Sequence, residues 1–287
     1  MANSKDLDQY YTKTEIANQC CEKLKSLFPN LESHTFLEPS AGTGSFIDAI
    51  HNTFGNVRIK AYDIDPKKKG IKKADFTRLP LAGRHLITVG NPPFGKRSSL
   101  AIDFFNIAAQ KSDIVAFIVP VQFEKYGVQR RLDKRFKLIL SERLPSYAFV
   151  FDDEDCDIRC VFQIWTIMET GFRDLRIHQA PAVKHSDFEM FLYNNTEAAR
   201  KYFNKENYGW NFAVPRQGFY DYTLRITEQQ SLSPRIQYMF FKTDDDAVLQ
   251  RLLNMDFELL SQNNTTTPGF GKADVIKAYE AEYHESV

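Results

Sequence analysis

The residues in this chain best suited to chemistry are the consecutive Asn91, Pro92, Pro93 and Phe94. The run 85–90 before them is short and apolar and is bounded by turn residues, which predicts a buried strand. The prolines end that strand and hold the Asn91 amide and the Pro92 carbonyl rigidly, because proline fixes φ and donates no N–H. Two acceptors beside the flat ring of Phe94 suit a planar ring that carries an exocyclic NH2 group. A plain Pro-Pro turn, with Asn91 as a local cap, is the alternative interpretation.

A second candidate cluster lies upstream, in the glycine-containing loop 39–44. A short strand precedes the loop and a helical pattern follows it, which is how nucleotide-type sites begin. The glycines let a ligand approach the backbone, and the helix N-terminus supplies free N–H groups. The loop lacks both the third glycine of a dinucleotide motif and the Gly-Lys pair of a phosphate loop. Glu38, at the end of the strand, favours a ligand with an ammonium group over one with a pyrophosphate.

Acidic residues extend this candidate site. Asp63 lies 19 residues after Gly44, at the end of a predicted strand, where a carboxylate can bind the hydroxyl groups of a ribose. A solvated strand end is the alternative there. Asp75 and Phe76 suit an adenine, since the carboxylate can accept from its amine and the ring can stack on it.

The elements that must position these residues alternate between strand and helix up to about residue 168. Helices are expected at 13–28, 46–54 and 100–109, and strands at 35–38, 57–62, 85–90, 114–119 and 160–167. This order predicts an α/β fold, with a mostly parallel sheet and helices on both faces. Thr12 and Glu15 are expected to form a capping box for the first helix. Tyr10, Tyr11 and Thr12 then stand in a loop that either lines a pocket or packs as a turn.

Residues 171–287 lose this alternation, so we expect two domains, 1–170 and 171–287. The segments 208–212 and 216–222 mix aromatic and amide side chains with Arg216, as base edges and nucleic-acid backbones require. Ordinary packing of a small lobe is the alternative. Helices are predicted after the acidic run 243–246 and at 272–283.

The chain has 37 basic and 37 acidic residues, so only a local patch can indicate nucleic-acid binding. The basic stretch 125–143, which includes Arg130 and Arg131, is the strongest such patch, and an amphipathic surface helix is its alternative interpretation. Residues 171–287 carry 13 basic and 16 acidic side chains, which excludes a basic arm.

The sequence shows no signal peptide and no apolar run of 18 residues, so a soluble, cytoplasmic protein without a membrane partner is expected. The 287 residues suffice for one sizeable core and a smaller lobe. Cysteines 20, 21, 156 and 160 lack zinc spacing, so we expect reduced, partly buried thiols and no metal.

Taken in order, these segments resemble the S-adenosylmethionine-dependent amino methyltransferases. The segments are 8–12, 37–44, 63–65, 75–76 and 91–94, and the resemblance covers residues 8 to about 168. The Tyr-Thr motif, Tyr11 and Thr12, comes first, and a variable region, 171–287, comes last. This order is similar to that of the gamma-class N6-adenine DNA methyltransferases. The resemblance implies a seven-stranded methyltransferase sheet and a target-recognition lobe at 171–287. RNA and protein-glutamine methyltransferases share the Asn-Pro-Pro-aromatic motif and remain alternatives, as does a non-catalytic binding subunit.

The resemblance implies S-adenosylmethionine as the cofactor. Tyr11 and Thr12 would hold its methionine end, and Glu38 with the following loop would take its amino and carboxyl groups. Its ribose would bind Asp63, and its adenine would lie between Asp75 and Phe76. The full set of implied cofactor residues is Tyr11, Thr12, Glu38, Pro39, Ser40, Ala41, Gly42, Gly44, Asp63, Ile64, Asp75, Phe76 and Asn91.

The resemblance also implies that Asn91 and Pro92 grip the target amine and that Phe94 stacks on the target base, with Asn91, Pro92, Pro93 and Phe94 as the catalytic set. A second stacking ring is expected at Phe151, or alternatively at Phe149. The expected contacts to the base and to DNA are Phe94, Phe151, Lys96, Arg130, Arg131 and Arg216. Double-stranded DNA is the expected partner, with adenine flipped out of the helix. A restriction-modification or phage/host protection role is implied, with any restriction endonuclease on a separate chain, and a monomer or weak dimer is expected.

Overall fold

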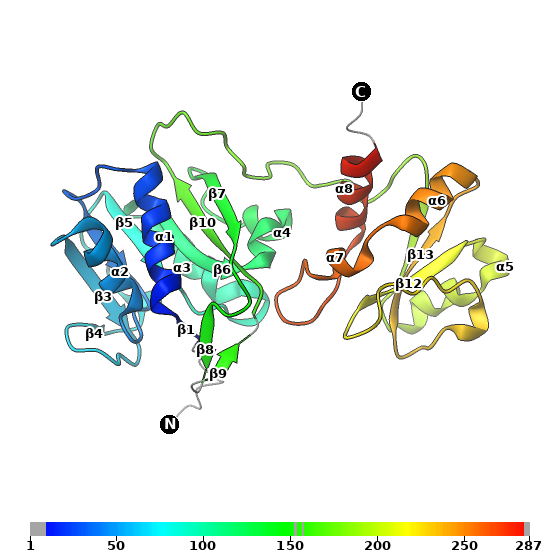
Figure 1. Cartoon of the computed structure of the whole chain (residues 1–287), viewed down its shortest axis with the longest axis horizontal. Coiled ribbons are helices and arrows are strands. Elements are labelled where there is room, and N and C mark those ends of the chain that lie inside the picture. The colour runs from blue at the N-terminus through cyan, green and yellow to red at the C-terminus, as the bar shows by residue number, and fades with distance from the viewer. Residues whose placement is uncertain (1–9, 152–153, 157, 284–287) are drawn as a thin grey trace. The chain divides into compact units, whose positions relative to one another are not determined.

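The computed structural model describes residues 10–151, 154–156 and 158–283 of the chain. The chain divides into two compact units, Met1–Gln179 and Ala180–Val287 (Figure 1). Of the site residues expected from the sequence, Arg216 belongs to the second unit and all others belong to the first.

The first unit is built on a seven-stranded sheet with the strand order β4-β3-β2-β5-β6-β10-β7. Its strands are β2 (Thr35–Glu38), β3 (Arg58–Asp63), β4 (Lys72–Lys73), β5 (Leu86–Gly90), β6 (Ser112–Pro120), β7 (Lys137–Arg143) and β10 (Cys160–Thr166). The pairs from β4 through β6 are parallel, whereas β10 is antiparallel to both of its neighbours. The expected α/β fold with a mostly parallel seven-stranded sheet is therefore confirmed.

Helices cover both faces of this sheet, as expected. Helices α1 (Thr14–Leu27) and α2 (Ser45–Phe54) pack with Ile114 and Ala116 in one core cluster. Helix α3 (Ser99–Ala109) packs with Val115 and Phe117 in another. Alternate residues of β6 thus enter opposite cores, which explains why its sequence is apolar throughout.

One expectation and one alternative interpretation are wrong, both because contacts distant in sequence decide the local structure. Thr12 does not cap α1: Lys13 is the N-cap residue and makes no side-chain cap bond. Strand β1 (Tyr11–Thr12) instead pairs with β8 (Phe149–Phe151), which forms a hairpin with β9 (Glu154–Cys156). The basic stretch 125–143 is not one long helix, because the four-residue α4 (Tyr126–Gln129) leads through a loop to strand β7.

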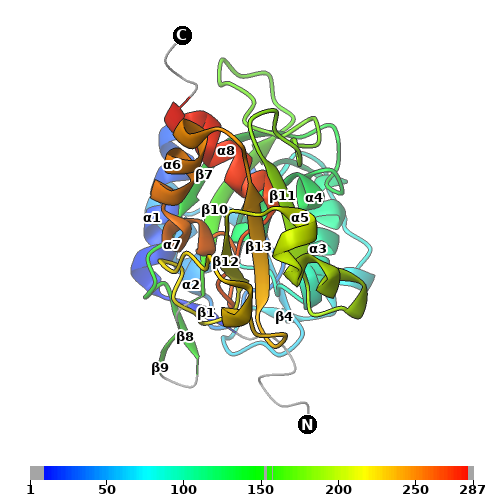
Figure 2. The ribbon, with the colours of Figure 1, turned by 90° about the vertical axis from the view of Figure 1, so that its right-hand side faces the viewer.

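The second unit contains a three-stranded antiparallel sheet of order β11-β13-β12 (Figure 2). Its elements are β11 (Glu189–Tyr193), β12 (Phe212–Gln217), β13 (Gln237–Lys242), α5 (Lys205–Tyr208), α6 (Asp246–Asn254), α7 (Phe257–Ser261) and α8 (Lys272–Tyr283). The two helices predicted here are present as α6 and α8. Asp245 caps α6 by accepting from the backbone N–H groups of Ala247 and Val248.

Most aromatic residues of the second unit pack its interior. Trp210, Phe212 and Tyr222 are buried, so the packing alternative holds for these three. Phe219 and Tyr220 differ, with 81% and 39% of their surfaces exposed. Among the described helices, none is both long enough and apolar enough to cross a membrane.

The cysteines whose side chains are described, Cys20, Cys21 and Cys160, are free and buried. Burial raises the pKa of each of these thiols above its ordinary value. They are therefore inert core residues. The side chain of Cys156 lies outside the described residues.

Candidate active site

The sheet positions the candidate site at the point where its strand order reverses. The chain runs outward from β2 through β3 to β4 and then returns to β5, on the other side of β2. Ligands of open α/β sheets bind at the carboxyl ends of the strands beside such a reversal. Glu38 ends β2 and Asn91 directly follows β5, so both lie at this edge.

Two adjoining cavities lie at this edge. The larger has a volume of about 470 Å³ and the smaller of about 30 Å³. Five residues line both of them: Tyr10, Tyr11, Ser40, Gly42 and Asn91.

Most residues expected from the sequence line these cavities. The larger cavity is lined by Tyr11, Pro39, Ser40, Gly42, Asp63, Ile64, Asp75, Phe76, Asn91, Pro92, Pro93, Phe94 and Lys96, and the smaller adds Thr12, Glu38 and Ala41. Gly44 is the exception among the expected cofactor residues. It lines neither cavity and is the N-cap residue of α2, with a φ of 88° that favours glycine.

Several lining residues were not expected. They are Thr43, Ser45, Phe46, Ala74, Thr77, Gly95, Leu100 and Phe104. Tyr10 lines both cavities, in line with the pocket interpretation of the loop 10–12. Leu100 and Phe104 lie four residues apart on α3, and their apolar type is equally typical of a core position.

The Asn91 side chain is held in one orientation. Its Nδ2 donates to the Tyr10 carbonyl oxygen at 3.0 Å. Because a carbonyl can only accept, the amide nitrogen must face Tyr10 and Oδ1 must face away. Asn91 Oδ1 is buried and has no hydrogen-bond partner. A buried acceptor of this kind is unfavourable until a donor reaches it, which marks it as a binding group.

Neighbouring contacts fix the loop that carries Asn91. The Ser40 hydroxyl donates to the Asn91 carbonyl at 2.9 Å and so joins the loops after β2 and β5. The Phe94 carbonyl accepts from the Ala101 N–H in the first turn of α3, at 3.2 Å. The Phe94 ring stacks with the Tyr10 ring, with centroids 6.3 Å apart and planes inclined by 25°.

The two candidates for a second stacking aromatic have different outcomes. Phe149 is fully buried in the core on one face of the sheet, so its ring is not available to a ligand. The side chain of Phe151 lies outside the described residues.

Glu38 places a carboxyl group in the wall of the smaller cavity. Oε1 accepts from the Ser40 N–H at 3.3 Å, whereas Oε2 is buried and has no partner. Burial raises the pKa of Glu38 well above its ordinary value, the Ser40 bond opposes the shift, and the nearby charge of Asp63 adds to it. The carboxyl packs against the backbone of Gly90, where a Cβ atom would overlap with Oε1. A cationic partner would favour the charged form of this group.

Asp63 is held as a fixed carboxylate at the end of β3. Oδ2 accepts from the Gly42 N–H and Oδ1 from the Asp65 N–H, each at 2.7 Å. Gly42 has a φ of 46°, and a Cβ atom there would lie 3.1 Å from the Tyr11 ring. Glycine at this position thus lets Tyr11 close over the loop.

Asp75 and Phe76 line the larger cavity. Asp75 is the N-cap residue of the 3₁₀ turn Phe76–Arg78 and accepts from the Thr77 hydroxyl at 2.6 Å. That bond, aided by the Thr77 N–H and the charge of Arg78, lowers the pKa of Asp75. The carboxyl group is therefore ionised at neutral pH and can only accept. The Phe76 ring lies 4.9 Å from the Phe104 ring, centroid to centroid.

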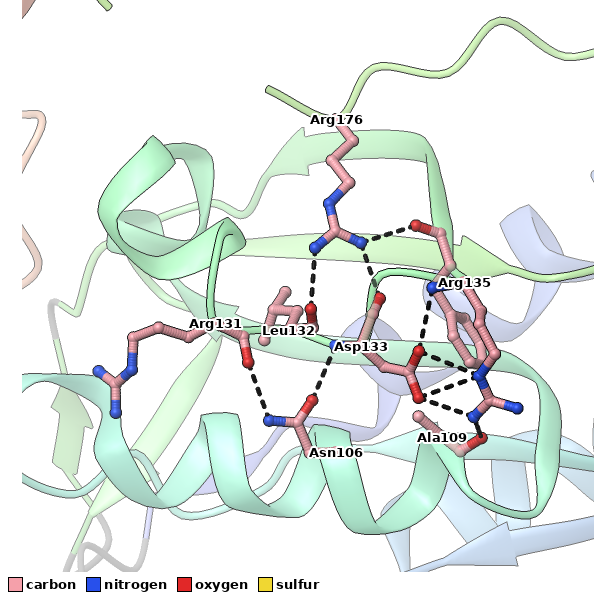
Figure 3. A network of polar contacts seen from close by, with 8 residues as sticks. Asn106, Ala109, Arg131, Leu132, Asp133, Arg135 and Arg176 are labelled. Carbon is pink, nitrogen blue, oxygen red and sulfur yellow. Dashed lines mark hydrogen bonds and ion pairs between the residues drawn. The ribbon is translucent and has the colours of Figure 1, made fainter. Parts of the chain in front are cut away.

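The basic residues lie outside the cavities, apart from Lys96. Arg130 and Arg131 are exposed, and the Arg131 carbonyl accepts from Asn106 at 3.1 Å. Asn106 lies about 9 Å along α3 from Leu100, which lines the larger cavity. Figure 3 shows the Arg131 side chain pointing away from the polar network around Arg176.

Arg176 fixes the loop that carries these arginines. Its guanidinium is buried and donates to four backbone carbonyl groups at 2.7–2.9 Å. Figure 3 shows the bonds to the Leu132 and Asp133 carbonyl groups. The four acceptors belong to Gln129, Leu132, Asp133 and Phe136. The guanidinium also lies over the Trp165 ring, 5.6 Å from its centroid.

Arg216 is tied into its own lobe. It donates to the Phe270 carbonyl at 3.2 Å and to Gln237 Oε1 at 3.0 Å. Burial lowers the pKa of its guanidinium from the ordinary value. A contact between Arg216 and DNA remains a prediction.

No protein-family model matches the chain, and no curated protein matches it. A modification subunit of a candidate type I restriction enzyme from Vibrio vulnificus YJ016 is 16% identical, with a TM-score of 0.42, over 55% of this chain and 44% of its own. A candidate class I S-adenosylmethionine-dependent methyltransferase from Listeria monocytogenes is 14% identical, with a TM-score of 0.45, over 59% of this chain and 64% of its own. A candidate RNA methyltransferase from Pyrococcus horikoshii is 19% identical, with a TM-score of 0.44, over 57% of this chain and 89% of its own. This chain spans less than two thirds of the first two, and likeness at this level says nothing about its reaction or substrate.

Proposed function

We propose that this protein transfers a methyl group from S-adenosylmethionine to the N6 amine of adenine in DNA. The observation that carries the proposal is the Asn91 amide, whose Oδ1 is buried and unpartnered while its Nδ2 is bound to Tyr10. An exocyclic amine must have its N–H bonds accepted before it is held in place. The fixed Asn91 oxygen supplies one acceptor, and the rigid Pro92 carbonyl beside it supplies the other.

The residues around the cavities fit the proposed cofactor. Glu38 Oε2 and Thr12 Oγ1 are buried polar atoms without partners, and both residues line the smaller cavity, where an ammonium group would satisfy them. Asp63 would accept from ribose hydroxyls, and Asp75 with Phe76 would hold an adenine. The larger cavity, about 470 Å³, lies within the usual range of about 300–1,000 Å³ for ligand pockets.

When bound, S-adenosylmethionine supplies a methyl group on a sulfonium, which is a good leaving group. The protein has to orient the amine, whose lone pair is delocalised into the base. Accepting its N–H bonds at Asn91 and Pro92 draws the nitrogen toward tetrahedral geometry and localises that lone pair. Orientation of this kind contributes up to about 7–11 kcal/mol. No strong base is needed, because a methylated ammonium loses its proton readily to water.

A base inside a duplex cannot reach this cavity, so the adenine has to leave the stack. Flipping costs a few kcal/mol, and stacking on one aromatic ring returns about 1–3 kcal/mol. Phe94 lines the larger cavity and is the first such ring. Phe151 is the proposed second ring, and Lys96 is the proposed phosphate contact nearest to the cavity.

DNA is proposed over RNA and protein-glutamine because the Tyr-Thr motif comes first in the chain and a separate lobe, Ala180–Val287, follows the catalytic unit. We assign target recognition to that lobe. A restriction-modification or phage/host protection system is the proposed setting, with cleavage on another chain. A binding subunit without activity is disfavoured, because the fixed amide orientation and the glycine loop are both retained.

The test is transfer of a labelled methyl group to duplex DNA, bulk RNA and protein in parallel, followed by nucleoside and amino-acid identification. Label in N6-methyladenine from DNA is the expected result. Label in RNA or protein would contradict the DNA assignment and retain the Asn91 chemistry. Cofactor binding without transfer to any of the three would support the binding-subunit alternative.

Asn91→Ala is expected to reduce transfer by at least about 100- to 1,000-fold, because it removes an oriented acceptor from the reacting group. Cofactor affinity, measured by calorimetry, should change little. Asn52→Ala, which alters an exposed residue of α2, is the matched control. Equal losses of transfer and cofactor affinity in Asn91→Ala would contradict the role given to this amide.

A further inference from the structure

Tyr10 contacts two residues of the candidate site, Asn91 through its backbone carbonyl and Phe94 through its ring. Its carbonyl accepts from Asn91 Nδ2 at 3.0 Å, across 81 residues of sequence. Its ring stacks with the ring of Phe94, and the residue lines both cavities. Tyr10 therefore contacts both groups that would hold the target base in the proposed reaction, the Asn91 amide and the Phe94 ring.

The carbonyl contact decides which atom of Asn91 the ligand meets. A free asparagine side chain can turn by 180° and present its nitrogen or its oxygen with similar energy. With the Tyr10 carbonyl at 3.0 Å, only the nitrogen can face residue 10 without repulsion between two oxygens. The unpartnered Oδ1 is therefore a consequence of where residue 10 lies.

The Tyr10 carbonyl is in turn held by the side chain and by strand β1. The Tyr10 ring packs against the core cluster that includes Phe94 and Phe149. Strand β1 pairs with β8 through Tyr11 opposite Val150 and Thr12 opposite Phe149. The Lys13 N–H also donates to the Ala148 carbonyl, at 3.1 Å. Residue 10 is thus fixed from its ring and from the strand that follows it.

We propose that Tyr10 is a positioning residue for the methyl transfer: its carbonyl turns the Asn91 oxygen toward the target amine, and its ring fixes Phe94. The proposal rests on the function proposed above. Tyr11, the next residue, serves as the matched control. Its ring lies over Gly42 in the cofactor loop, and it makes no hydrogen bond to the Asn91 side chain among the contacts described for that amide.

The first measurement needs no substrate. In protein labelled with ¹⁵N-asparagine, the Asn91 side-chain amide is assigned by its loss in Asn91→Ala, and its hydrogen exchange is then measured. Tyr10→Ala removes the ring that anchors the carbonyl, so exchange at the Asn91 Nδ2 group should accelerate by at least about tenfold. Tyr10→Phe keeps the ring and should retain the slow exchange of the wild type. Tyr11→Ala should also retain it.

The second measurement separates kcat from cofactor affinity. Tyr10→Ala should lower kcat by about 10- to 100-fold, since a small misplacement of a reacting group has effects of this size. Its dissociation constant for S-adenosylmethionine alone should change less than about threefold. Tyr10→Phe should recover most of the lost kcat. Tyr11→Ala should show the opposite pattern, with weaker cofactor binding and normal Asn91 exchange. Thermal unfolding of each variant confirms that the fold is retained.

Unchanged exchange at Asn91 in Tyr10→Ala would overturn the proposal, as would a rise in the cofactor dissociation constant without a fall in kcat. The second result would make Tyr10 a cofactor contact. If the wild-type protein methylates neither DNA, RNA nor protein, the proposed function fails, and the exchange comparison still decides whether Tyr10 orients the amide.

Discussion

At the scale of single residues, the burial of Glu38 disfavours the charged form of its carboxyl group. Its side chain is almost fully buried, and its single described hydrogen bond comes from a backbone N–H. The raised pKa means that the folded protein binds a proton here more tightly than the unfolded chain does. Between the unfolded pKa of about 4.3 and the raised folded pKa, the free energy of unfolding therefore falls as the pH rises.

Glu38→Gln should remove this dependence, because an amide does not titrate. The variant is expected to gain thermal stability relative to the wild type, and the difference should grow as the pH rises from about 5 through the raised pKa. It should bind S-adenosylmethionine about tenfold more weakly, since a neutral acceptor replaces a charged one opposite the ammonium group. Thermal unfolding across this pH range and calorimetry at neutral pH measure the two effects. A stability difference that shrinks as the pH rises would contradict this account.

Single residues also show the limits of reading the sequence. Asn91, Glu38 and Asp63 were identified because their types and their places after predicted strands both carried information. The contact between Tyr10 and Asn91 was not predictable, because Tyr10 makes it through its carbonyl, a group that every residue possesses. The loop position of Gly44 predicts a cofactor contact, whereas its backbone conformation begins helix α2.

At the scale of elements, the parallel strands β2, β5 and β6 were predictable because each is a short, mainly apolar run, and β3 because its residues alternate. Strand β4 consists of two exposed lysines and carries no such pattern. Strand β1 was likewise not predictable, since two residues carry no period and its partner β8 lies far along the chain. The conformation of the loop from Gln129 to Phe136 was not predictable from its sequence either. Its conformation depends on Arg176, which bonds four of its carbonyl groups from a segment beyond β10.

Arg176→Ala should lower the free energy of unfolding by about 3–5 kcal/mol, because it leaves several buried carbonyl groups without a donor. Arg176→Lys should recover only part of the loss, since an ammonium group cannot match the planar fork of the guanidinium. Denaturant unfolding of the whole chain measures both. Arg173→Ala, at an exposed arginine three residues earlier, is the control and should change stability by no more than about 0.5 kcal/mol. An equal effect of the two alanine variants would contradict the role of the buried guanidinium.

At the scale of the whole molecule, charge balance limits how the protein could hold the proposed DNA substrate. Equal numbers of basic and acidic residues leave no long-range attraction, so phosphate contacts have to come from local groups such as Arg130 and Arg131. The second unit shows the same limit for aromatic residues. Their number suggested a binding lobe, but residue type does not separate buried Trp210 from exposed Phe219, which only tertiary packing decides.

The double variant Arg130→Ala/Arg131→Ala should weaken DNA binding similarly for all sequences. It should reduce the slope of log Kobs against log salt by about 1–2, because each phosphate contact contributes about 0.9 to that slope. Fluorescence anisotropy over a range of salt concentrations measures it. The control is Arg58→Ala/Arg84→Ala, which removes the same charge at exposed positions by the amino ends of β3 and β5. An unchanged slope in the first variant would remove both arginines from the DNA interface.

The pairing of β1 with β8 also sets an order of events during synthesis. Strand β1, the glycine loop and β5 all leave the ribosome well before Val150. Strand β1 therefore has no pairing partner at the time when the glycine loop and β5 have already been synthesised. Strand β10 follows β7 in the chain yet lies between β6 and β7 in the sheet, so the sheet too is completed late. On the role proposed for Tyr10, an unfinished chain can carry a cofactor loop but not an oriented Asn91 oxygen. The proposed methyl transfer would then be confined to molecules whose first unit has been completed.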